Sequence, residues 1–201
     1  MTPEQIYFLT LGLLNLVVAV AGSRIEDLDG KPASIHFLTF GFLAFSFSWF
    51  LYAFEIGTSL QIVSAVLSLI FIWGILIFSF KRCEKRVPWF FIISGFLLHS
   101  CIQSYLTYKN DFTAVLHLSG VIIPAIFLII IYLFFTVKKE RNSSDTTLIY
   151  VFLIMIIVLV SRSVALETSA EFFAITKITS QAIWPAFSVA VGVFSFLSFT
   201  Q

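Results

Sequence analysis

Long apolar runs, separated by short polar segments, dominate the chain. A bilayer core requires about 20 apolar residues per helix. Seven runs are close to that length or exceed it, and they are Pro3–Gly22, Ile35–Ile56, Leu60–Phe80, Val87–Tyr108, Phe112–Val137, Leu148–Leu166 and Ile178–Thr200. Stretches such as LIFIWGILIF and IFLIIIYLFF lack the polar–apolar alternation of barrel strands. Because lipid admits only helices and closed barrels, the pattern predicts an all-α polytopic membrane protein with seven transmembrane helices.

The segments between these runs are short. Gly57-Thr58-Ser59 joins the second run to the third, and Lys109-Asn110-Asp111 joins the fourth to the fifth. None of the connections has room for an independent soluble domain. We therefore expect a single transmembrane domain over residues 1–201.

The composition supports a membrane location. Hydrophobic residues make up 59% of the chain and charged residues 11%, against about 45–50% and about 25% in soluble domains. This balance excludes intrinsic disorder, and it leaves too few polar residues to cover a soluble surface. A net charge of +1 offers nucleic acid no basic surface. We expect the lipid bilayer as a partner and no nucleic acid.

The basic residues predict an orientation. Nine of the twelve Lys and Arg residues lie in alternate connections, and these are Arg24, Lys31, Lys81, Arg82, Lys85, Arg86, Lys138, Lys139 and Arg141. Cytoplasmic loops carry the excess of Lys and Arg. The N-terminus is therefore expected outside and the C-terminus in the cytoplasm, in what we take to be a bacterial inner membrane.

Polar side chains inside the apolar runs are candidate site residues, because ionisable groups are costly in lipid and usually functional. In the predicted orientation they gather in the outer half of the membrane. The set is Glu55, His99, Gln103, His117, Arg162, Glu167 and Gln181. His99 and Gln103 are four residues apart and share a helix face. The set predicts a ligand pocket that opens to the outside, while ordinary hydrogen bonding between helices stays an open alternative.

Charge and spacing suggest what the pocket can hold. Arg162 is suited to an anionic group, or to pairing with Glu55 or Glu167. The histidines lie on separate helices without the spacing of a ligand set, so we expect no metal and no cofactor.

Two prolines interrupt predicted helices. Pro124 lies near the middle of the fifth and Pro185 in the outer half of the seventh, and both should bend their helices. Ser188 and Gly192 give the seventh helix small residues for close packing. These features suit either a flexible output helix or ordinary kinking.

Enzyme motifs are missing from the sequence. We find no GxSxG elbow, HExxH or P-loop, and no aspartate lies within an apolar run. A proton-coupled transporter would need a carboxylate at mid-membrane, which no run supplies. We do not expect the chain to be an enzyme.

Residues 35–86 resemble the membrane sensor region that precedes bacterial GGDEF diguanylate cyclases. The similarity rests on IHFLTFGFLAFSFSWFLYAFE, a short turn, SLQIVSAVLSLIFIWGILIFSFKR and the basic loop that follows. The resemblance implies a sensory module whose last helix feeds a cytoplasmic domain. The chain has no Gly-Gly-Asp-Glu-Phe sequence, so a cyclase or kinase domain would lie outside it.

These observations favour a membrane sensory or signal-transducing domain. It would detect a small or lipophilic ligand through its outer half and relay the signal to the cytoplasm. A second copy of the chain and a cytoplasmic signalling protein both stay open as partners. The alternatives are a small transporter or channel, and a structural or partner-binding membrane subunit.

Overall fold

The computed structural model describes residues 1–29, 34–54, 57–137, 143–168 and 170–197. Every regular element in these ranges is helical, which confirms the all-α prediction. The elements are α1 (Pro3–Asp29), α2 (Ser34–Ala53), α3 (Thr58–Arg82), α4 (Trp89–Tyr108), α5 (Phe112–Tyr132), the π-helix η1 (Leu133–Val137), α6 (Ser143–Thr168) and α7 (Ala170–Leu197).

Six stretches of the described chain are long and apolar enough to cross a bilayer. They are Pro3–Arg24, Ile35–Ala53, Thr58–Arg82, Trp89–Tyr108, Phe112–Val137 and Ser143–Thr168. In α7 the apolar stretch Ala182–Phe196 is shorter. Each of the seven α-helices also exposes large apolar side chains. A soluble monomer rarely exposes so much apolar surface, so the bilayer is the environment that fits these helices.

Several helices extend beyond the predicted runs: α1 ends at Asp29 rather than at Gly22, and α7 begins at Ala170 rather than at Ile178. α6 begins at Ser143 rather than at Leu148, and Asp145 lies fully buried in its first turn. The sixth helix therefore contains an aspartate that lies outside the apolar run predicted from the sequence. The hydrophobic pattern missed the start because polar residues suit a helix N-terminus, where a carboxylate interacts favourably with the helix dipole.

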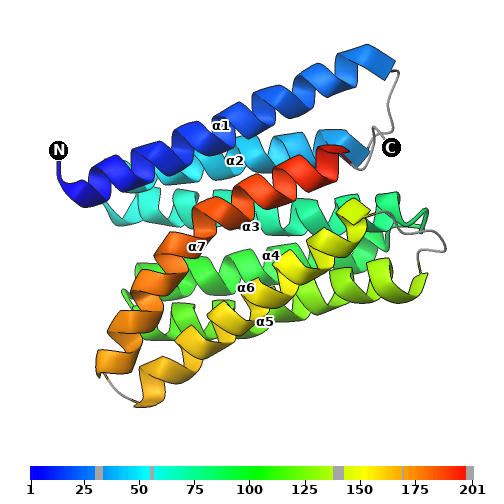
Figure 1. Cartoon of the computed structure of the whole chain (residues 1–201). Coiled ribbons are helices and arrows are strands. Elements are labelled where there is room, and N and C mark those ends of the chain that lie inside the picture. The colour runs from blue at the N-terminus through cyan, green and yellow to red at the C-terminus, as the bar shows by residue number, and fades with distance from the viewer. Residues whose placement is uncertain (30–33, 55–56, 138–142, 169, 198–201) are drawn as a thin grey trace. The chain divides into compact units, whose positions relative to one another are not determined.

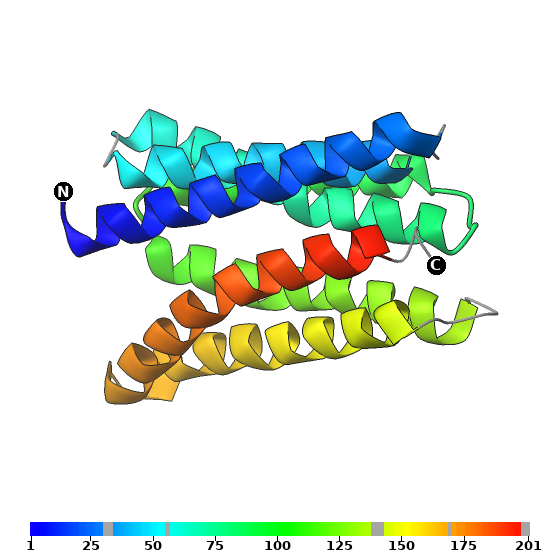
Figure 2. The ribbon, with the colours of Figure 1, turned by 45° about the horizontal axis from the view of Figure 1, so that its top comes forward.

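The chain divides into two compact units, Met1–Phe112 and Thr113–Gln201. In the first unit α1 packs against α2, α2 against α3, and α3 against α4. Figures 1 and 2 show α1, α2 and α3 running side by side. The prediction of a single domain over residues 1–201 stays a prediction.

Glycines and aromatic rings hold α2 against α3. A Cβ atom at Gly74 would lie 3.0 Å from the carbonyl oxygen of Phe37, and one at Gly41 would lie 3.3 Å from the Cα atom of Phe71. The ring of Phe45 stacks on that of Phe71 with centroids 4.5 Å apart. The two backbones thus approach closely, as small residues allow in membrane helices.

Serines extend this contact. The hydroxyl of Ser48 lies 3.0 Å from that of Ser64 and 2.6 Å from that of Ser68. Ser64 also donates to the backbone carbonyl of Ser48 at 3.0 Å. These polar groups of α2 and α3 therefore satisfy one another inside the first unit.

The second unit is built around aromatic rings. Phe127 of α5, Phe152 of α6 and Phe187 of α7 meet pairwise, with centroids 5.1 to 5.9 Å apart. α5 contains Pro124 and passes into η1, and α7 contains Pro185. In Figures 1 and 2 α7 changes direction along its length, as a proline inside a helix predicts.

Candidate functional site

α4 has a polar buried face and an apolar exposed face. Its buried residues are Ile92, His99, Ser100, Gln103 and Thr107. Its exposed residues include Phe90 and Phe91, whose exposed fractions are 77% and 74%. This arrangement is the reverse of a soluble amphipathic helix. It suits a helix that turns apolar side chains to lipid and polar ones to the protein interior.

The polar atoms of this face lack partners. His99 is 2% exposed, and among the described residues neither of its ring nitrogens has a hydrogen-bond partner. The same holds for the Ser100 hydroxyl and the Gln103 side-chain carbonyl. A buried polar group left unsatisfied costs about 1–3 kcal/mol. We call His99, Ser100 and Gln103 the α4 polar face.

α3 packs an indole ring against α4 in the turn before His99. The ring of Trp73 lies over Gly95, where an added Cβ would come within 2.5 Å of it, and meets the ring of Phe96 edge-on. The indole nitrogen of Trp73 is buried, also without a partner among the described residues. The contact with Gly95 lies about one helical turn before His99. An indole N–H only donates, whereas the Gln103 side-chain carbonyl only accepts.

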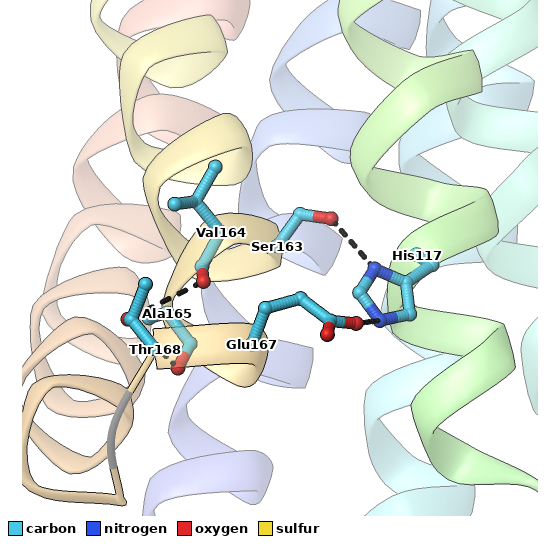
Figure 3. A network of polar contacts seen from close by, with 6 residues as sticks. All are labelled: His117, Ser163, Val164, Ala165, Glu167 and Thr168. Atoms are coloured by element: carbon cyan, nitrogen blue, oxygen red, sulfur yellow. Dashed lines mark hydrogen bonds and ion pairs between the residues drawn. The ribbon is translucent and has the colours of Figure 1, made fainter.

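His117 has a different environment (Figure 3). Its Nδ1 lies 3.0 Å from the hydroxyl of Ser163, and its Nε2 lies 3.0 Å from a carboxylate oxygen of Glu167. Ser163 and Glu167 are four residues apart and share one face of α6. The imidazole therefore links α5 to α6 through both nitrogens. We call these three residues the His117 clamp.

The connectivity of the clamp is that of a nucleophile, a base and an orienting acid. Its setting argues against catalysis. Ser163 lies inside the continuous helix α6, whose backbone N–H groups are used within the helix and cannot form an oxyanion hole. A Cβ at Gly120 would lie 2.7 Å from that of Ser163, so α5 covers the serine closely. The clamp is therefore suited to holding two helices together.

Arg162 directly precedes Ser163 of the clamp in the sequence, and its side chain is partly buried. Its Nε is buried and has no partner among the described residues. The carboxylate of Glu167, one of the partners suggested for Arg162, contacts His117. Glu55 lies outside the described residues, and the side chain of Gln181 is not described either.

The remaining predicted residues are buried or lie within helices. Pro124 is buried in α5, and Pro185 is partly buried in α7. Ser188 and Gly192 are buried, with Ser188 at 0% exposure. A partner-binding face would need these small residues exposed. Within the described ranges, no group of three or more His, Cys, Asp or Glu residues could hold a metal ion.

Several residues of the two sites were not among the sequence candidates. Ser100 and Trp73 escaped notice because a single serine or tryptophan in an apolar run is common. Ser163 had one usable signal, its spacing of four from Glu167. Its partner His117 is 46 residues away, and only the pairing of α5 with α6 brings them together.

Comparisons with known proteins do not indicate a function for the chain. The chain matches no protein-family model, no curated protein and no solved structure.

Proposed function

We propose that the chain is a seven-helix membrane sensory domain with its N-terminus outside and its C-terminus in the cytoplasm. The α4 polar face is its ligand site. The observation that carries the proposal is the set of buried, unpartnered polar atoms on His99, Ser100 and Gln103. Because such groups are rarely left unsatisfied in native proteins, a bound molecule or water completes their hydrogen bonds.

The chemistry of the face limits the ligand. α4 contains no Asp, Glu, Lys or Arg, so nothing on it compensates a charged ligand in a medium of low dielectric constant. An imidazole, a hydroxyl and an amide offer both donors and acceptors. The ligand is therefore a small uncharged molecule with hydrogen-bonding groups, lipophilic enough to enter between helices.

The signal would leave through the cytoplasmic end of α7. Pro185 removes one backbone hydrogen bond inside that helix, which makes its two halves easier to reorient. The resemblance of residues 35–86 to GGDEF-associated sensor regions supports this direction of signalling. The signal would be received by an output domain, by a second copy of the chain or by a cytoplasmic signalling protein.

Thermal unfolding of the purified full chain tests the ligand site. Uncharged amides, alcohols and quinones are screened for stabilisation of the wild type, of Ser100→Ala and of the control Ser94→Ala. Ser94 lies on the exposed face of α4. A compound at 100 times its dissociation constant should stabilise the protein by about 2.7 kcal/mol. We expect this effect in the wild type and in Ser94→Ala, and a reduced effect in Ser100→Ala.

The screen also separates the alternatives. If no compound class stabilises the wild type, or if Ser94→Ala and Ser100→Ala respond equally, the α4 polar face is not the ligand site. Flux of a stabilising compound across liposomes would indicate a transporter or channel. Co-purification of another membrane protein, with no stabilising compound, would indicate a structural subunit.

A further inference from the structure

The last turn of α3 and the turn that follows it carry four basic residues in six positions. They are Lys81, Arg82, Lys85 and Arg86, with Glu84 as the acid among them. Lys81, Lys85 and Arg86 are exposed. We propose that these three residues form a binding surface for the phosphate of an anionic phospholipid headgroup.

The backbone gives the turn a defined shape. The amide of Glu84 donates to the carbonyl of Lys81 at 3.0 Å, and that of Lys85 donates to the carbonyl of Phe80 at 2.9 Å. Glu84 adopts φ 55°, the left-handed conformation of a Schellman helix end. Cys83 and Val87 are buried on either side. The cations are therefore held on an ordered turn rather than on a long loop.

The turn must lie close to the lipid headgroups. Only residues 83–88 separate the candidate spans Thr58–Arg82 and Trp89–Tyr108. The headgroup layer is about 5–8 Å thick on each side of the hydrocarbon core. A connection of six residues that returns to the membrane therefore stays in or near this layer. Trp89, Phe90 and Phe91 are exposed at the start of α4, and Trp and Tyr favour the membrane interface.

Charge and position together favour a lipid over a soluble anion. Clusters of Lys and Arg next to a membrane helix attract anionic lipids at about 1 kcal/mol per residue. In the described chain, none of the three exposed cations forms an ion pair with an acidic side chain. Long Lys and Arg side chains can also reach the headgroup level while their stems stay in apolar surroundings.

Lipid retention in nanodiscs tests the surface. The full chain is reconstituted in phosphatidylcholine with a minor share of phosphatidylglycerol, and the lipids retained are measured by native mass spectrometry. The triple variant Lys81→Gln, Lys85→Gln, Arg86→Gln should lower the preference for phosphatidylglycerol on the order of 100-fold at low salt. The difference should shrink as ionic strength rises.

Two controls keep the charge effect apart from other causes. Lys109→Gln removes an exposed lysine at the opposite end of α4 and should leave the preference unchanged. Lys81→Arg with Lys85→Arg keeps the charge and should retain it. Equal retention by the triple variant and the wild type would overturn the proposal, as would an equal loss in Lys109→Gln.

A further variant applies if the triple variant does not fold. Glu84→Gln removes the acid in the turn and should raise the preference about five-fold, so an unchanged preference counts against the surface. Inorganic phosphate and polyphosphate are added as competitors. If either displaces the lipid at equal phosphate concentration, the site binds a soluble anion and the lipid proposal is wrong.

Discussion

Two histidines in the same membrane protein have opposite surroundings. His99 of α4 is 2% exposed, and both of its nitrogens lack partners among the described residues. His117 of α5 has partners on both nitrogens, Ser163 and Glu167. Two histidines that both lie within long apolar runs thus have different interactions. The imidazole of His117 links two helices, whereas that of His99 is the proposed ligand-binding group.

The hydrogen-bond partners of a polar residue in a membrane helix indicate its role. Burial differs between the two histidines, since the side chain of His117 is 34% exposed and His99 is 2% exposed, but burial alone does not separate a ligand site from a structural contact. The count of unsatisfied donors and acceptors does separate them, since an unsatisfied group is costly without a ligand and a satisfied group is not. Substitutions should therefore affect the two histidines in opposite directions.

The largest expected effect is at the glycine under the His117 clamp. Gly120→Val places carbon atoms where a Cβ would already lie 2.7 Å from that of Ser163. Overpacking of this kind costs about 3 kcal/mol at the upper end of its usual range. Denaturant unfolding in mild detergent measures the loss. Val121→Leu, which enlarges the exposed neighbouring side chain, should leave stability unchanged, and equal losses would show that α5 does not pack on Ser163.

Removing the clamping imidazole should have the next largest effect. His117→Leu deletes both polar contacts and leaves the Ser163 hydroxyl without its partner, so we expect a loss of about 1–3 kcal/mol. Unfolding of the variant in the same detergent gives the value. A neutral outcome would mean that the clamp contributes nothing to stability.

The same substitution at the other histidine should have the opposite sign. His99→Leu removes a buried imidazole without removing a hydrogen bond to a described residue, so ligand-free stability should stay level or rise by about 1 kcal/mol. The variant should also lose stabilisation by any compound that acts on the wild type. A destabilisation as large as that of His117→Leu would contradict the contrast between the two histidines.

The smallest expected effect is at the exposed end of the clamp. The side chain of Glu167 is 73% exposed, and exposed ion pairs contribute about 0–1 kcal/mol. Glu167→Gln should therefore cost less than 1 kcal/mol by this estimate, and far less than His117→Leu. Urea unfolding of both variants side by side gives the ranking, and a reversed ranking would place the clamp's main contribution at Glu167 rather than at Ser163.

The fold class was predictable from the sequence because lipid imposes a simple rule. Twenty-residue apolar runs such as Trp89–Tyr108 must be helical in a bilayer. Helix ends were less predictable. Ser143 and Asp145 extend α6 beyond its apolar run, since the hydrogen bonds that continue a helix do not depend on hydropathy.

The candidate site was predictable only in part. A spacing of four placed His99 and Gln103 on one face of a helix, and the structure buries both. The partners of His117 could not be inferred in this way. They depend on how α5 pairs with α6, and an apolar pattern that is nearly uniform around a membrane helix does not encode that register.

Thiol labelling at Ser100 is the most direct test of a ligand site that opens from the α4 polar face to the outside. Cys83 and Cys101 are first replaced by serine, and Ser100→Cys and the exposed Ser94→Cys are then treated from outside with methyl methanethiosulfonate, a small uncharged reagent. Only a thiol that ionises in water reacts, so we expect Ser100→Cys to react about ten-fold faster than the lipid-facing Ser94→Cys. Equal rates at the two positions would contradict the proposed site.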